Sequence, residues 1–163
     1  AADLGEDPNP LFIQEKIEKE VKDLDISILV NNAGVMHNEF YVNLPPKDIE
    51  GLVNLNCLAP LLLFNAFIAR IEAYSKKTGK RGAIINVDSV AGTGPAPFTA
   101  VYSGSKGYLR NLSLSVSEEI IERIDVLSLA PGPVNTALSG FLKSNTSMNF
   151  GTPEPITTVK NTL

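Results

Sequence analysis

Tyr102 and Lys106 are the two residues whose types and spacing point most clearly to chemistry. They are four residues apart in a stretch with helical periodicity, so a helix places both on one face, about 6 Å from each other. A lysine ammonium at that distance favours the phenolate and lowers the pKa of a tyrosine from about 10. A tyrosine whose pKa approaches neutrality can act as a general acid or base. Such a pair also arises readily by chance in a chain with four tyrosines, so the spacing alone leaves a purely structural role open.

Ser89 and Asn56 are two further polar residues at positions where chemistry is possible. Ser89 lies at the end of an apolar run, one residue after Asp88, and 13 residues before Tyr102; its hydroxyl can bind a substrate carbonyl or can cap a turn. Asn56 lies inside a helical stretch, where asparagine is a poor helix former. Pro60 has no N–H to donate to the Asn56 carbonyl, so it predicts a kink there. The freed carbonyl can hold a water molecule, or the kink can serve helix packing alone.

Apolar runs that alternate with amphipathic stretches indicate an α/β protein, with a parallel sheet and helices on both of its faces. Strands are predicted at 26–30, 83–87 and 125–129, and helices after Asn9-Pro10, from Pro45-Pro46 to about Tyr74, and from about Thr99 to Arg123. Parallel sheets of this kind bind ligands beyond the carboxyl ends of their strands. Asn31–Gly34, Asp88-Ser89 and Pro131–Thr136 follow the three runs, and we expect them to share one site.

Composition narrows the remaining function classes. The 163 residues, 44% hydrophobic and 20% charged, suit one globular domain. The net charge of −4 and the lack of a basic stretch argue against a nucleic-acid partner. No uninterrupted apolar run approaches the roughly 18 residues of a membrane span. With Cys57 and His37 as the single residues of their types, we expect neither a disulfide nor a metal site, and a hydrolase using Ser89 lacks its histidine. Without a span or a disulfide pair, we expect the protein in the cytoplasm, with an anchor or targeting segment ahead of Ala1 as the alternative.

Together, these motifs resemble the short-chain dehydrogenase/reductase family. The matching segments, in the family's order and spacing, are Asn31-Asn32-Ala33-Gly34, Val53-Asn54-Leu55-Asn56, Ser89, Tyr102-x-x-x-Lys106 and Pro131-Gly132. The resemblance implies a Rossmann-like, doubly wound parallel sheet. It also implies an enzyme that moves a hydride between NAD or NADP, with NADP slightly favoured, and a carbonyl or alcohol substrate.

The resemblance assigns roles to individual residues. By similarity, Tyr102 donates or accepts the proton, Ser89 orients the substrate oxygen, and Lys106 lowers the Tyr102 pKa and holds the nicotinamide ribose. Asn56 holds a water through its main-chain carbonyl. Besides Tyr102 and Lys106, the implied cofactor-binding residues are Asp3, Asn31, Ala33 and Gly34 on the adenosine side and Pro131, Gly132, Val134 and Thr136 on the nicotinamide side.

The sequence also departs from the family. The glycine-rich motif Thr-Gly-x-x-x-Gly-x-Gly and the last strand of the family are not found in it. We therefore expect residues 1–163 to form a single partial domain that lacks the first two strands and the last one, with an open edge at the 26–30 strand. The alternative is a truncated, catalytically inactive domain that acts only with full-length partners. The resemblance implies a homo-oligomer through the two long helices.

The sequence leaves two points open, the substrate class and the role of Asp88. An apolar segment, Leu138–Phe150, follows the third strand. In relatives this segment caps the site, which suggests a lid and a lipophilic ketone, a 3-oxoacyl chain or a steroid-like alcohol as substrate; a short helix packed on the sheet explains the segment equally well. Asp88 stands where the family frequently has serine, and the sequence assigns it no role.

Overall fold

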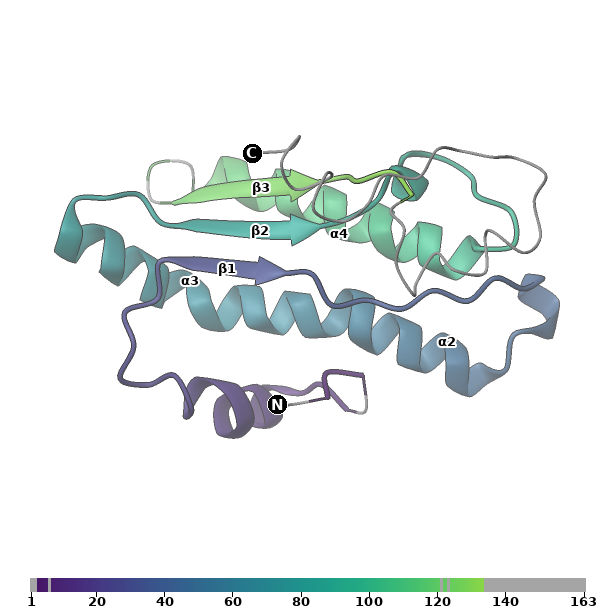
Figure 1. The fold of residues 1–163 in the computed structure, drawn as a ribbon, viewed down its shortest axis with the longest axis horizontal. Coiled ribbons are helices and arrows are strands. Elements are labelled where there is room, and N and C mark those ends of the chain that lie inside the picture. Colours follow the sequence, from purple (N-terminus) through teal and green to yellow (C-terminus); the bar gives the residue numbers. More distant parts are fainter. Residues whose placement is uncertain (1–2, 6, 121, 123, 134–163) are drawn as a thin grey trace.

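A computed structural model describes residues 3–5, 7–120, 122 and 124–133, which form a parallel sheet and its connecting helices (Figure 1). The elements are α1 (Pro10–Ile13), η1 (Gln14–Glu18), β1 (Ile28–Asn31), η2 (Tyr41–Asn43), α2 (Pro46–Val53), η3 (Asn54–Leu58), α3 (Ala59–Thr78), β2 (Ala83–Val87), η4 (Val90–Thr93), α4 (Ala100–Glu119) and β3 (Asp125–Leu129). Turns η1 and η3 are π-helical, and η2 and η4 are 3₁₀. The Rossmann-like α/β arrangement expected from the sequence is confirmed.

The three strands within the described residues are parallel and follow the order β1-β2-β3. Helix α3 connects β1 to β2, and α4 connects β2 to β3, so each connection is a strand–helix–strand crossover. Because the strands are parallel, their carboxyl ends meet at one edge of the sheet (Figure 1). Strand β1 lies at the side of the sheet, which agrees with the expected open edge.

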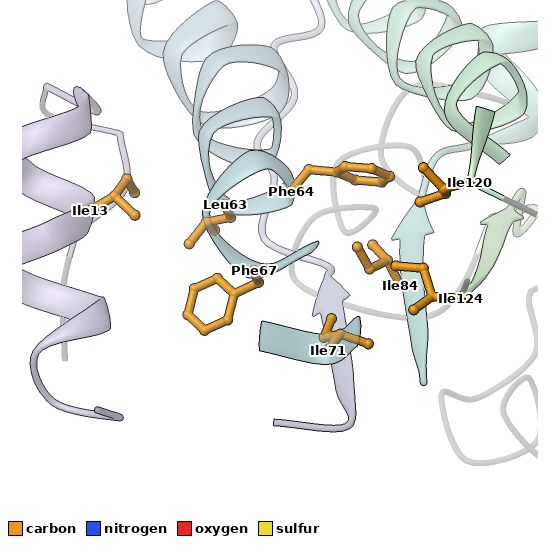
Figure 2. Packing of buried hydrophobic residues seen from close by; sticks show 8 residues of the cluster. All are labelled: Ile13, Leu63, Phe64, Phe67, Ile71, Ile84, Ile120 and Ile124. Carbon is orange, nitrogen blue, oxygen red and sulfur yellow. The ribbon is translucent and has the colours of Figure 1, made fainter. Parts of the chain in front are cut away.

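The core lies between the sheet and the helices on one of its faces (Figure 2). It consists of eight buried apolar side chains: Ile13, Leu63, Phe64, Phe67, Ile71, Ile84, Ile120 and Ile124. On the opposite face, Ile28, Val30 and Leu127 are 55%, 54% and 48% exposed. The expectation that both faces carry helices is therefore wrong for the described residues. A short run of β-branched residues is typical both of a strand in a sheet with one covered face and of a strand in a sheet with two. The sequence pattern therefore did not distinguish the two cases.

A buried chain of hydrogen bonds joins the carboxyl ends of β1 and β2 to α4. Asn31 Nδ2 donates to Asn86 Oδ1 at 2.7 Å, and Asn86 Nδ2 donates to Ser113 Oγ at 2.8 Å. Ser113 Oγ donates in turn to the Leu109 carbonyl at 2.7 Å. Because buried polar groups are costly when unpaired, this chain fixes the end of the sheet against the helix that carries Tyr102.

The kink predicted at Pro60 takes the form of a π-helical turn. Helices α2 and α3 form one continuous helical region, Pro46–Thr78, interrupted by η3, where the Ala59 N–H donates to the Asn54 carbonyl. Such turns are frequent at functional sites, and Asn56 lies inside this one.

Contrary to the expectation from uninterrupted apolar runs, the region Pro46–Thr78 is long and apolar enough to cross a membrane by length and composition. Phe64, Phe67 and Ile71 of this region are buried in the hydrophobic core, which is how a core helix packs (Figure 2).

Candidate active site

Four residues predicted from the sequence, Asn56, Ser89, Tyr102 and Lys106, come together beyond the carboxyl ends of β1 and β2. Tyr102 and Lys106 lie on the first turns of α4, Asn56 lies in η3, and Ser89 follows β2. Tyr102, Lys106 and Asn56 are buried, at 7%, 4% and 1% exposed. Helix α4, turn η3 and the segment after β2, which are far apart in the sequence, therefore supply one small cluster of polar side chains.

Lys106 is directed at the end of β2 as well as at Tyr102. Its Nζ lies 5.7 Å from the centroid of the Tyr102 ring and donates to the Val87 carbonyl at 2.8 Å. Burial lowers the pKa of Lys106, whereas the nearby Asp88 and Cys57 raise it. The Lys106 ammonium is thus held by its hydrogen bond to the Val87 carbonyl and by the electrostatic effect of Asp88 and Cys57.

The expected direction of the Tyr102 pKa shift is wrong in this structure. Burial raises the pKa of Tyr102, the Ser89 side chain lowers it through a hydrogen bond, and the charge of Asp88 raises it. The spacing of Tyr102 and Lys106 placed the pair correctly, but burial opposes ionisation of the phenol. The Tyr102 phenol is therefore neutral at physiological pH in this state.

Ser89 has the turn-capping role that its sequence position allowed, and its hydroxyl also lies near Tyr102. Its backbone is extended, its Oγ accepts the Ala91 N–H at 3.2 Å and so caps η4, and the same hydroxyl lies close enough to Tyr102 to influence the pKa of the phenol. Ser103 Oγ of α4 donates to the carbonyls of Ala91 and Gly94 at 2.8 and 3.0 Å. The turn that carries Ser89 is thus fastened to the helix that carries Tyr102.

The Asn56 side chain ties the loop after β1 to α4. Its Oδ1 accepts the Val35 N–H at 2.9 Å, and its Nδ2 donates to the Val35 carbonyl at 2.9 Å and to Ser105 Oγ at 3.1 Å. Ser105 Oγ donates to the Tyr102 carbonyl at 2.7 Å. The side chain is fully engaged, so the Asn56 main-chain carbonyl is the group left for the water-holding role expected from the sequence.

The Asn31–Gly34 turn brings the backbone of the chain close to this group. A Cβ placed on Gly34 lies 3.2 Å from Asn56 Oδ1 and 3.4 Å from Lys106 Nζ. The Asn31 side chain instead faces Asn86, and its Oδ1 is buried without a partner among the described atoms. Gly34 is therefore the residue of this turn that meets Lys106.

A small hollow of about 50 Å³ lies beside the same turn. It is lined by Leu4, Val30, Asn31, Asn32, Ala33, Leu55, Ala59, Pro60 and Leu63. The structure thus brings Leu4 to the place expected for the adenosine side, whereas Asp3 is exposed and accepts the Gly5 N–H at 2.9 Å. Of the residues expected on the adenosine side, Asn31 and Ala33 line this hollow, and Asp3 does not.

The nicotinamide-side residues are described in part. The Val90 N–H donates to the Pro131 carbonyl at 3.2 Å, which places Pro131-Gly132 next to the turn that carries Ser89. Val134, Thr136 and the expected lid, Leu138–Phe150, lie outside the described residues.

Asp88, which the sequence placed at the site without a role, is hydrogen-bonded to Ser128, which the sequence did not place there. Asp88 is 2% exposed and accepts a hydrogen bond from Ser128 Oγ at 2.9 Å. An acidic residue directly after a buried strand is the signal that marks Asp88, whereas nothing in the sequence marks Ser128. Within the described part of the chain, no group of three or more His, Cys, Asp or Glu residues could hold a metal ion.

Comparison with known proteins adds sequence relatives. A profile of the family described as short chain dehydrogenase matches residues 6–147. The very-long-chain 3-oxoacyl-CoA reductase of Coccidioides immitis is 33% identical over 152 residues, which cover 91% of this chain and 41% of that protein. Reductase-B of the same description from Danio rerio is 32% identical over 159 residues, which cover 94% and 48%. The chain thus spans less than half the length of these relatives.

Solved structures with the same fold carry nicotinamide dinucleotides. The 3-ketoacyl-(acyl-carrier-protein) reductase of Brucella melitensis, complexed with NADH, matches this chain with a TM-score of 0.75 at 26% identity. The match covers 85% of this chain and 56% of the reductase chain. A short-chain dehydrogenase of Sphingobium yanoikuyae in complex with NADPH has a TM-score of 0.73 at 25% identity and covers 94% and 57%.

Proposed function

The chain belongs to the short-chain dehydrogenase family, and from this membership we propose that it interconverts a carbonyl and an alcohol with a nicotinamide dinucleotide. The observation that carries the proposal is the convergence of Ser89, Tyr102 and Lys106 at the carboxyl ends of the strands. This is the place where open α/β sheets bind their ligands.

The residues around the site fit a dinucleotide. The hollow beside Ala33 and Leu4 offers an apolar surface to an adenine ring, and Gly34 lets the backbone approach without a side chain. The Lys106 ammonium can donate to the hydroxyls of a ribose. Bound there, the dinucleotide supplies or accepts the hydride.

The chain's own residues then handle the proton. Tyr102 is neutral because burial raises its pKa, so its hydroxyl can donate the proton to the oxygen of a carbonyl as that carbonyl is reduced. Ser89 Oγ, beside Tyr102, orients the same oxygen by a hydrogen bond. In the reverse direction, the Tyr102 phenolate accepts the proton of the alcohol.

Ser89→Ala is expected to move the pH profile of alcohol oxidation to higher pH. The Ser89 hydrogen bond lowers the Tyr102 pKa, so its loss raises that pKa further, and the phenolate that oxidation needs forms only at higher pH. The measurement is kcat/KM for oxidation between pH 6 and about pH 11 in both proteins, within the alkaline range where tyrosine titrates. A profile of Ser89→Ala that coincides with wild type, or that lies at lower pH, contradicts this role.

We propose a 3-oxoacyl thioester as the substrate class. The proposal is supported by the two relatives named as very-long-chain 3-oxoacyl-CoA reductases, which are 33% and 32% identical to this chain. The test offers the protein a long-chain 3-oxoacyl-CoA or a steroid ketone, each with NADH or NADPH, and follows the dinucleotide absorbance. Turnover of the thioester supports the proposal, turnover of the ketone alone contradicts the substrate class, and no turnover with either contradicts the function.

A second candidate function is association with a partner without catalysis. It is favoured by the apolar row of Ile28, Val30 and Leu127, which is about half exposed on the open face of the sheet. Fluorescence titration with NADPH separates the two candidates. Saturable binding of NADPH and turnover of a substrate by this chain would exclude the hypothesis that it is a catalytically inactive domain.

A further inference from the structure

Asp88 holds a buried carboxylate that is only half satisfied. Its Oδ2 accepts from Ser128 Oγ at 2.9 Å, and its backbone N–H donates to the Leu129 carbonyl at 2.9 Å. Its Oδ1 is buried and has no hydrogen-bond partner among the described residues. A buried carboxylate in that condition is costly unless a positive charge lies close by.

The residues on either side of Asp88 identify that charge. The Val87 carbonyl accepts the Lys106 ammonium at 2.8 Å, and Ser89 faces Tyr102. Asp88 lies between these two contacts, and both Asp88 and Lys106 are nearly excluded from solvent, at 2% and 4% exposed. The two charges therefore interact through a region of low dielectric constant, where a separation of several ångströms still couples them.

The other titratable groups around Lys106 do not supply a counter-charge. Cys57 of η3 faces Lys106, and burial raises the pKa of its thiol, so it is neutral at physiological pH. Tyr102, on the same helix as Lys106, is kept neutral because burial raises its pKa. Among the described groups that act on Lys106, Asp88 is the one that carries a negative charge.

We propose that Asp88 is a positioning residue that supplies the buried counter-charge of Lys106 and so keeps the ammonium fixed at the end of β2. Asp88 acts through Lys106. Ser128 fixes the carboxylate from β3. This inference deepens the proposed function and rests on it for its catalytic meaning.

The directions of the neighbouring pKa shifts agree with the geometry. Burial lowers the pKa of Lys106, and the charge of Asp88 opposes that effect. The same charge adds to burial in raising the pKa of Tyr102. One buried carboxylate thus favours a charged lysine and a neutral tyrosine, the pair of states that carbonyl reduction requires.

The test is an NMR titration of Lys106 in protein with ¹³C-labelled lysine side chains, with the signal assigned by its loss in Lys106→Arg. Asp88→Asn keeps the shape of the side chain and its ability to accept from Ser128, but removes the charge. The Lys106 midpoint is expected to move to lower pH in Asp88→Asn and to return toward wild type in Asp88→Glu. The same midpoint in wild type and Asp88→Asn overturns the proposal.

Asp25→Asn is the matched control. It removes the same charge from an exposed ion pair with Lys77, far along the chain from α4, and is expected to leave the Lys106 midpoint unchanged. An equal shift in Asp25→Asn and Asp88→Asn indicates a general charge effect and overturns the proposal.

A second variant, Asp88→Ser, serves if Asp88→Asn does not fold. It also removes the negative charge near Lys106, so the Lys106 midpoint is again expected to move to lower pH. An unchanged Lys106 midpoint overturns the proposal.

Turnover is read separately. In an active protein, Asp88→Asn is expected to move the pH profile of kcat, a change that a merely structural role does not produce. The NMR titrations need neither substrate nor turnover. If the wild-type protein does not turn over substrate, the proposed function is contradicted. If the Lys106 midpoint does not change in Asp88→Asn, the positioning role of Asp88 is contradicted.

Discussion

Tyr102→Phe is expected to lower turnover by about 10²–10⁴-fold while dinucleotide affinity stays within about twofold of wild type. The substitution removes the hydroxyl that donates the proton and keeps the ring, which is buried on the first turns of α4 beside Lys106. Lys106, which is proposed to bind the ribose, retains its hydrogen bond to the Val87 carbonyl. The measurements are steady-state kinetics and fluorescence titration with NADPH.

Tyr108→Phe is the matched control for this substitution. Tyr108 lies on the same helix but is 40% exposed, so the same chemical change is expected to leave both turnover and affinity unchanged. Wild-type turnover in Tyr102→Phe, or an equal loss in both variants, contradicts the assignment of Tyr102 as the proton donor.

Gly92→Ala is expected to damage the site through the backbone. A Cβ at this position lies 2.7 Å from the Gly107 nitrogen and 2.7 Å from the Lys106 carbonyl carbon, so η4 must move away from α4. Overpacking of this kind costs about 1–3 kcal/mol of stability. The movement also displaces Ser89 from Tyr102, and a misplacement of about 1 Å can cost about 10²-fold in rate. Thermal unfolding and kcat/KM measure the two effects.

Gly94→Ala controls for glycine replacement in the same loop. Its backbone is extended, and nothing lies within 4 Å of the added Cβ, so stability and kcat/KM are expected to stay near wild type. If Gly92→Ala behaves like Gly94→Ala, the close packing of η4 on α4 does not position Ser89.

Local sequence rules predicted the parts of the site that depend on spacing and covalent structure. The spacing of Tyr102 and Lys106 requires only a helix to bring them to one face, and α4 provides it. Pro60 cannot donate a hydrogen bond, and the π-helical turn around Asn56 results. Likewise, the apolar run 83–87 coincides with β2.

Features that depend on burial were not accessible to the same reasoning. The Tyr102 pKa is raised because the phenol is buried, and the spacing to Lys106 carries no information about burial. The role proposed for Asp88 depends on Lys106 of α4, and its carboxylate is held by Ser128 of β3, 40 residues away. The exposure of Val30 could not be predicted either, because an apolar strand has the same composition whether one or both faces of its sheet are covered. In each case, tertiary packing decides the property.

The most direct test of the central claim, that this site transfers a hydride to a carbonyl with proton donation by Tyr102, follows the hydride itself. The protein is incubated with a 3-oxoacyl-CoA and NADPH deuterated on the transferring position of the nicotinamide, and the product is analysed by mass spectrometry. We predict a 3-hydroxyacyl-CoA that carries one deuterium on its carbinol carbon, formed by wild type and strongly reduced in Tyr102→Phe. A product without deuterium, or the same yield from both proteins, contradicts the account.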